Sequence, residues 1–133
     1  MGAVTSVMRA QQVLVGRLNG ILKPHGLTFP RYEALMVLHR ATEPLPLSRL
    51  GEQLQVHKAT VTSIVDRLEA QALAERLHDR TDRRAVLAQI TSEGQRVAEA
   101  ASADVAAAAF AIPDLDTHAL DALYALLTPL RRP

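Results

Sequence analysis

Cysteine is absent from this chain of 133 residues, and aromatic side chains make up only 3% of it. Without cysteine there is no disulfide framework, no thiol nucleophile, no cysteine zinc site and no thiol-based peroxide sensing. An excess of one charge is also lacking, since the formal net charge of +1 argues against a nonspecific nucleic-acid coat or a polybasic membrane binder. No apolar run reaches the roughly 18 residues of a membrane span, and the N-terminus has no signal-peptide pattern. We therefore expect a cytoplasmic protein with no membrane partner.

What the chain does contain favours a helical fold. Hydrophobic residues make up 48% of the sequence. With so few aromatics, the core must be built from Leu, Val, Ile and Ala, which suit helices that pack closely. A length of 133 residues fits a single domain, which at this size needs no metal or disulfide to support its core.

Proline and glycine divide the chain into helical segments with apolar residues at helical spacing. We expect an amphipathic helix over 5–22, a second helix with Thr28 as its N-cap that ends before Glu43 and Pro44, and a short helix over 49–55 with Ser48 as its N-cap. Further on, Ser92 can cap a long helix that runs toward Phe110. After Pro113, Asp114 or Asp116 can start the last helix.

The middle of the chain has the pattern of a helix-turn-helix followed by a hairpin. Between residues 57 and 71, the apolar residues Val61, Ile64, Val65 and Leu68 form one stripe of a helix. Residues 73–77 and 86–90 are compatible with two short strands, joined by a polar turn over 78–85. This order predicts a mainly α fold with a small β-wing, in which the second helix of the pair can enter a DNA major groove.

The outward face of that second helix has the side chains expected of a DNA-reading surface. Ala59 and Ser63 are small enough for the backbone to approach base edges, and Thr and Ser hydroxyls bond to bases or phosphates. An ordinary solvated helix face would favour Glu, Lys and Gln instead. The predicted DNA contacts from this helix are Lys58, Ala59, Thr60, Thr62, Ser63 and Arg67.

The hairpin concentrates positive charge that the whole-chain average conceals. Residues 76–84 contain four arginines and two aspartates. Arginines at the tip, namely Arg80, Arg83 and Arg84, can enter a minor groove or hold phosphates. We expect Asp79 and Asp82 to hold these arginines through charge-assisted bonds. Asp66 faces DNA and would be repelled by phosphates, so we expect it to pair with an arginine of the wing or near Arg67.

Three segments, 61–69, 79–84 and 90–94, together resemble the MarR family of bacterial transcription regulators, and the resemblance covers essentially the whole chain. The family's wing pattern is matched at Asp79, Asp82, Arg84, Thr91 and Gly94. Thr81 stands where the pattern has arginine, which leaves open whether Arg80 or Arg83 enters the groove, and Ile90 stands where it has leucine. His57 replaces a frequent serine N-cap, and Ala72 replaces a frequent helix-ending glycine.

The resemblance implies an obligate homodimer within one MarR-like domain, 1–133. Residues 1–27 and 92–133 would supply dimerisation helices, and residues 28–91 would form the winged helix-turn-helix lobe. Each lobe would read half of a palindromic site in double-stranded DNA. Such proteins are usually repressors that release DNA when a small effector binds between the lobes, and we assign no ligand-binding residue here.

Three other interpretations have less support in the residues. An enzyme would need a catalytic motif, and the chain has no glycine-rich phosphate loop, no His-Glu-x-x-His and no nucleophile elbow, so we expect no catalytic residue and no cofactor. A metal-responsive regulator would need clustered ligands, whereas no two of the five histidines lie three or four residues apart on one helix, so we assign no metal site. A winged helix can also serve as a protein-interaction module without DNA binding.

Overall fold

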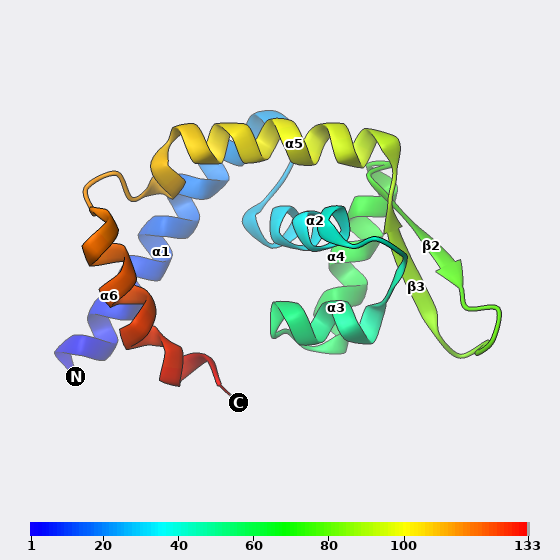
Figure 1. Ribbon diagram of the computed structural model, residues 1–133, viewed down its shortest axis with the longest axis horizontal. Coiled ribbons are helices and arrows are strands. Elements are labelled where there is room, and N and C mark those ends of the chain that lie inside the picture. Colours follow the sequence, from blue (N-terminus) through cyan, green and yellow to red (C-terminus); the bar gives the residue numbers. More distant parts are fainter. Residues whose placement is uncertain (133) are drawn as a thin grey trace.

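The computed structural model describes residues 1–132, which form helices with one small antiparallel sheet. Figure 1 shows the elements in their colours along the chain. The elements are, in order, α1 (Gly2–Leu22), η1 (Lys23–His25), α2 (Phe29–Arg40), β1 (Leu45–Pro46), α3 (Leu47–Leu54), α4 (Lys58–Ala70), β2 (Ala74–His78), β3 (Val86–Ile90), α5 (Ser92–Ala107), η2 (Ala109–Ala111), α6 (Thr117–Leu127) and η3 (Thr128–Arg131).

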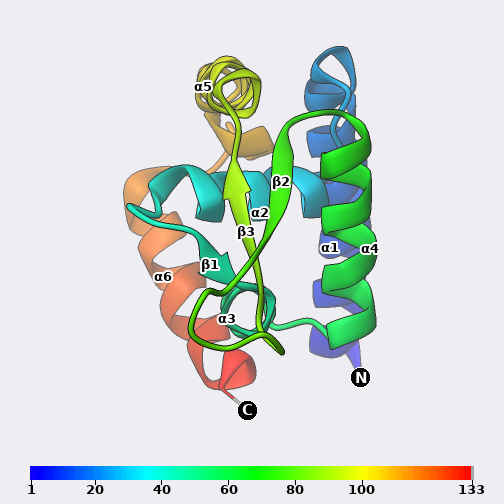
Figure 2. The same cartoon turned by 90° about the vertical axis from the view of Figure 1, so that its right-hand side faces the viewer.

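Helix α5 connects two ends of the molecule (Figure 1). At one end lie α1 and α6, which come from the two termini of the chain. At the other end lie α2, α3, α4 and the sheet, whose hairpin extends away from the helices. Figure 2 shows α5 end-on, with α4 standing beside β2. The predicted winged helix is therefore one end of the molecule, and the terminal helices are the other.

The sheet has the order β1-β3-β2 with both pairings antiparallel. In the hairpin, Ala74 pairs with Ile90 at the base and His78 pairs with Val86 next to the turn. Short β1 adds to the free edge of β3 through Leu45 opposite Ala88. The hairpin confirms the predicted strands to within one residue, because the polar turn over 78–85 marks the end of one strand and the start of the next.

The core consists of aliphatic side chains, as the scarcity of aromatics predicts. Leu22, Leu35, Leu50 and Leu68 are completely buried, and no buried polar or charged residue occurs among the described residues. The apolar stripe of α4 is buried along its whole length against α2 and α3. This packing fixes which face of α4 points outward, since a helix that buries one stripe must expose the opposite one.

Two predicted helix caps are wrong by one or two residues. Ser48 lies inside α3, because Pro46 has the extended backbone of an N-cap and Leu47 is already helical. Ser92 is the first residue of α5, and Thr91 is the cap: its Oγ1 accepts from the Gly94 N–H at 2.9 Å. An N-cap needs an extended backbone, and Pro46 and Thr91, which directly precede the first helical residues, supply it.

The predictions for the other helix ends are confirmed only in part. Thr28 does occupy the N-cap position of α2, but its side chain makes no capping bond. Asp116 caps α6 by accepting from the Ala119 N–H at 2.8 Å, which settles the choice between the two predicted aspartates. Helix α5 ends at Ala107 rather than near Phe110, because residues 109–111 all have positive φ and cannot continue a right-handed helix.

The terminal helices leave much apolar surface uncovered. Exposed large hydrophobic residues on α1 and α6 include Val4, Met8, Val13, Leu123 and Leu126. None of the helices within residues 1–132 combines the length and the apolarity that crossing a bilayer requires.

Candidate nucleic-acid interface

Every side chain of α4 that the sequence places on its outward face is exposed. This holds for Lys58, Ala59, Thr60, Thr62, Ser63, Asp66 and Arg67. The Thr62 hydroxyl donates to the Lys58 carbonyl one turn earlier at 3.0 Å, so it presents lone pairs rather than a proton to a partner. Residue His57 occupies the N-cap position without a side-chain capping bond. The first turn of α4 therefore keeps free N–H groups next to Lys58.

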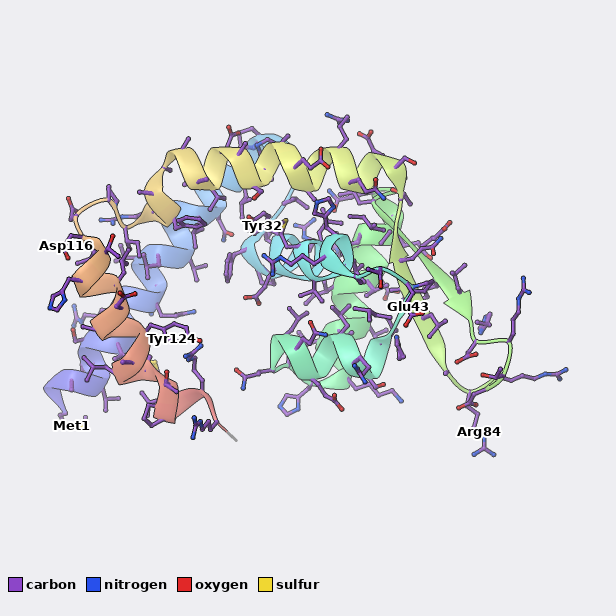
Figure 3. The ribbon with its side chains drawn as sticks, viewed as in Figure 1. Met1, Tyr32, Glu43, Arg84, Asp116 and Tyr124 are labelled. Atoms are coloured by element: carbon purple, nitrogen blue, oxygen red, sulfur yellow. The ribbon has the colours of Figure 1, made fainter. Side chains whose placement is uncertain are left out.

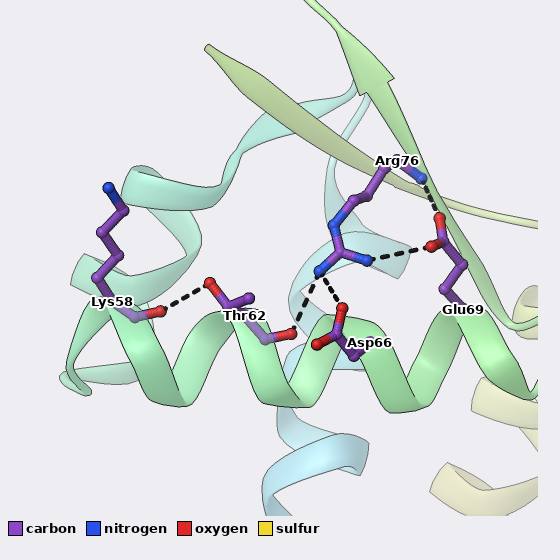
Figure 4. A network of polar contacts seen from close by, with 5 residues as sticks. All are labelled: Lys58, Thr62, Asp66, Glu69 and Arg76. Atoms are coloured by element: carbon purple, nitrogen blue, oxygen red, sulfur yellow. Dashed lines mark hydrogen bonds and ion pairs between the residues drawn. The ribbon is translucent and has the colours of Figure 1, made fainter. Parts of the chain in front are cut away.

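Arg76 on β2 joins the wing to α4 (Figure 4). Its guanidinium bonds to Asp66 Oδ1 at 2.5 Å, to Glu69 Oε1 at 3.1 Å and to the Thr62 carbonyl at 3.3 Å. The Arg76 backbone N–H also donates to Glu69 Oε2 at 2.9 Å. The side chain of Arg76 is 24% exposed, so it lies largely under the surface while the two carboxylates stay at the surface.

The expected pairing of Asp66 with an arginine of the wing segment is thus confirmed, and the partner is Arg76. Sequence reasoning missed Glu69, the second carboxylate that Arg76 binds. A signal for it was present, because Glu69 lies three residues after Asp66 and therefore on the same side of the helix. One arginine compensates two negative charges that would otherwise face a bound polyanion.

The two aspartates of the wing turn bond to its backbone and not to its arginines. Asp79 Oδ1 accepts from the Thr81 N–H at 3.0 Å and from the Thr81 hydroxyl at 2.8 Å. Asp82 Oδ1 accepts from the Arg84 N–H at 3.0 Å. The bonds from Thr81 hold the pKa of Asp79 below its ordinary value. The expectation that these aspartates hold arginine guanidinium groups is wrong, because short Asp side chains in turns reach the amide two residues on more readily.

The arginines of the wing tip are consequently available to an outside partner. Within residues 1–132, Arg80, Arg83 and Arg84 form no ion pair, and all three are exposed. Figure 3 shows Arg84 pointing away from the body of the protein at the end of the hairpin. Free guanidinium groups on an extended hairpin suit contact with phosphates or a narrow minor groove.

Two grooves border the outward face of α4. One, of about 760 Å³, lies between α3 and the start of α4. The other, of about 390 Å³, lies between α4 and the wing and places residues of both elements around one space: Pro46, Leu47, Ser48, Lys58, Thr62, Arg76, His78, Arg84, Ala85 and Val86. Lys58 of α4 and Arg84 of the wing thus border the same groove, although they lie far apart in the sequence.

The fold and this surface define a winged helix-turn-helix protein with a helical extension from both termini. Comparison with known proteins agrees. Residues 25–85 match the family model described as MarR family. The MarR family regulator Sco5413 of Streptomyces coelicolor superposes with a TM-score of 0.91 at 42% sequence identity, over 98% of this chain and 91% of that protein. This chain belongs to the MarR family of transcriptional regulators.

Two other relatives extend the comparison. The organic hydroperoxide resistance transcriptional regulator of Bacillus subtilis is 35% identical over 81 residues, 61% of this chain and 54% of the regulator. The alignment thus spans about half the length of that curated relative. A mutant of MarR from E. coli, solved in a complex with operator DNA, superposes with a TM-score of 0.88 at 22% identity, over 99% of this chain and 95% of that one, which establishes a shared fold.

Proposed function

We propose that the protein is a sequence-specific DNA-binding transcriptional regulator. The observation that carries this proposal is the groove between α4 and the wing, which Lys58, Thr62 and Arg84 border beside the exposed face of α4. An α-helix fits the DNA major groove, while an arginine-tipped hairpin next to it can follow the backbone into the minor groove.

The side chains divide between positioning and reading. Lys58, Arg67 and Arg84 suit phosphate oxygens, which fix the register of the protein on the duplex. Ala59, Thr60 and Ser63 are short enough to let α4 approach base edges, and methyl groups of Ala and Thr can contact thymine. Arg80 and Arg83 are the candidates for insertion into the minor groove, since both are exposed and neither is paired within the described chain.

We further propose that the protein acts as a homodimer through its terminal helices. The chain exposes 9294 Å², whereas a folded monomer of this mass exposes roughly 6,900 Å². The excess of about 2,400 Å² per chain is what an obligate homodimer interface would cover. The exposed apolar residues of α1 and α6, among them Met8 and Leu126, supply such a surface. Two α4 helices would then read the two halves of a palindromic operator.

The regulatory details follow from family membership and are part of this proposal. We expect repression in the cytoplasm, with release of DNA when a small effector binds. Because the 133 residues contain no cysteine, an effector must act through noncovalent contacts or through chemistry other than that of a thiol. We propose no catalytic role for the protein. Among residues 1–132 no three His, Asp or Glu side chains are grouped as a metal site would require, so no metal is included either.

Selection of bound duplexes from a random pool, followed by mobility shifts at several salt concentrations, tests the DNA-binding proposal. We expect a palindromic consensus and an affinity that falls steeply with salt, because each neutralised phosphate releases counterions. Arg83→Ala and Arg84→Ala should each weaken binding. Arg96→Ala, which removes another exposed arginine, paired with Glu93 on α5, serves as the control. An affinity that does not change with salt would refute DNA binding and favour a protein-interaction module.

Sedimentation tests the dimer. Leu126→Glu places a charge on an exposed apolar position of α6 and should shift the protein toward monomer, since burying that charge is costly. Ala70→Glu adds the same charge on the exposed surface of α4 and should leave the dimer intact. Equal sedimentation of both variants would contradict an interface at α6.

A further inference from the structure

The corner between α1 and α2 is bonded to the end of α4 that lies away from Lys58. Gly26 in this corner has φ +72°, and its carbonyl accepts from Gln71 Nε2 at 2.6 Å. A Cβ at Gly26 would lie 3.1 Å from that same Nε2, so the glycine allows both the turn and the close approach. Gln71 is the C-cap residue of α4. A side chain at the end of the DNA-facing helix is therefore anchored to a backbone atom outside the helix-turn-helix.

Arg31 holds the other side of the same amide. Its Nη1 donates to Gln71 Oε1 at 3.1 Å, and its Nε donates to Thr28 Oγ1 at 3.1 Å. The Gln71 amide thus donates through its nitrogen and accepts through its oxygen, which fixes its orientation. Together, Arg31 and Gln71 connect the first turn of α2 to the C-cap residue of α4.

The corner is also bonded to the helices that we propose for dimerisation. The Phe29 N–H donates to Asn19 Oδ1 of α1 at 2.8 Å. His25 Nε2 lies 2.6 Å from Asp104 Oδ2 of α5. Helices α1, α5 and α4 therefore meet at one set of polar contacts, whereas the wing lies at the far end of the winged helix (Figure 1).

We propose that the Arg31–Gln71 pair positions α4 relative to the dimerisation helices and so sets the spacing between operator half-sites that the dimer accepts. This inference rests on the proposed function. The side chains of the pair bond to Thr28, Gly26 and each other, and not to the side chains predicted to contact DNA, so the pair acts on DNA only through the position of α4.

Small movements of α4 are large on the scale of DNA. A helix of 13 residues is about 20 Å long. If the helix turns by about 5° around its Gln71 end, its Lys58 end moves by roughly 1.7 Å. When both α4 helices of a dimer turn in this way, the distance between their Lys58 ends changes by about 3.4 Å, which is one base-pair step. The buried stripe of α4 resists translation into the core, but a tilt of a few degrees requires only small side-chain adjustments. Contacts at the Gln71 end are therefore well placed to restrict that tilt.

The test compares binding of the full chain to its selected palindrome and to versions with one base pair added or removed at the centre. We expect the wild type to prefer the original spacing by at least about tenfold, because misplacing one half-site forfeits most of its contacts. Arg31→Met and Gln71→Met should each reduce that preference to about threefold or less. The salt dependence should stay the same for Gln71→Met, since no phosphate contact is lost.

The pair must also behave as a unit. The double variant should lose less than the sum of the two single losses, because both changes break the same Arg31–Gln71 contact. Arg31→Lys should restore part of the preference by donating to Gln71. Arg96→Met is the control for lost charge. Thermal unfolding identifies a variant that does not fold, and Gln71→Met carries the test if Arg31→Met fails. Single variants that keep the wild-type preference, additive losses, or a wild type that binds every spacing equally would overturn the inference. A wild type that binds no selected duplex would instead refute the proposed function.

Discussion

Replacing Arg76 with methionine removes the one guanidinium that compensates two carboxylates on α4. Asp66 and Glu69 are 60% and 44% exposed at the side chain, so their pairs with Arg76 lie in a partly hydrated environment. Such pairs each contribute about 0.2–1 kcal/mol to folding. We therefore expect Arg76→Met to lower the free energy of unfolding by about 1 kcal/mol and to leave the fold intact.

The larger effect is expected on DNA binding. A carboxylate about 7 Å from a phosphate is repelled by about 0.6 kcal/mol in bulk water and by a few times more when the DNA displaces the water. Two uncompensated carboxylates, Asp66 and Glu69, should thus cost about 1–2 kcal/mol in binding, which corresponds to roughly 5- to 30-fold weaker affinity. Arg76→Met should bind its selected duplex more weakly by that factor in a mobility shift or by fluorescence anisotropy.

A second substitution distinguishes electrostatic repulsion from a structural change as the cause of the weaker DNA binding. Adding Asp66→Asn to Arg76→Met removes one of the two unpaired charges and should recover about half of the lost binding free energy. Arg96→Met, which removes one positive charge on α5, should change affinity by less than about twofold. If Arg76→Met binds DNA as the wild type does, or if adding Asp66→Asn recovers no affinity, then Arg76 does not act by compensating the charges of the two carboxylates.

Three further predictions concern the framework of the site. Ala72 has φ +59°, a conformation unfavourable for alanine, so Ala72→Gly should raise the free energy of unfolding by about 0.5–1 kcal/mol in chemical denaturation; a decrease would contradict the strain. A Cβ at Gly94 would lie 2.0 Å from the Leu73 carbonyl oxygen, so Gly94→Ala should cost about 3 kcal/mol or more by the same measurement, and an unchanged midpoint would refute it. The bonds from Thr81 lower the pKa of Asp79, so their contribution to wing order is full above the ordinary aspartate pKa and is lost as pH falls through the lowered value; the Thr81 amide resonance should report this titration, and Asp79→Asn should abolish it.

Much of the fold follows from local patterns in the sequence. The spacing of Val61, Ile64, Val65 and Leu68 determines both the presence of α4 and its outward face, since a helix has one period and one buried stripe. The polar turn over 78–85 between two short segments with apolar residues places the two hairpin strands. These features depend on residues within a few positions of one another, which is why no tertiary information was needed.

The side-chain contacts of the site could not be predicted from the sequence in the same way. The sequence leads to an arginine partner for Asp66, but only the way β2 crosses α4 makes that partner Arg76 and brings in Glu69. Likewise, the pattern of the wing names Asp79 and Asp82, yet the turn geometry directs them to backbone N–H groups. Side-chain partners in different elements depend on distances that a linear pattern does not contain.

The sequence by itself determined the order of the elements, the aliphatic core and the arginine-rich hairpin beside a helix of small polar residues. The tertiary structure alone decided which charges are compensated, which arginines remain free, where α5 ends, and that Arg31 meets Gln71. Residues 31 and 71 are joined at 3.1 Å because the end of α4 packs beside the start of α2. Periodicity is encoded within a few turns of one helix, whereas this meeting depends on the packing of the whole chain.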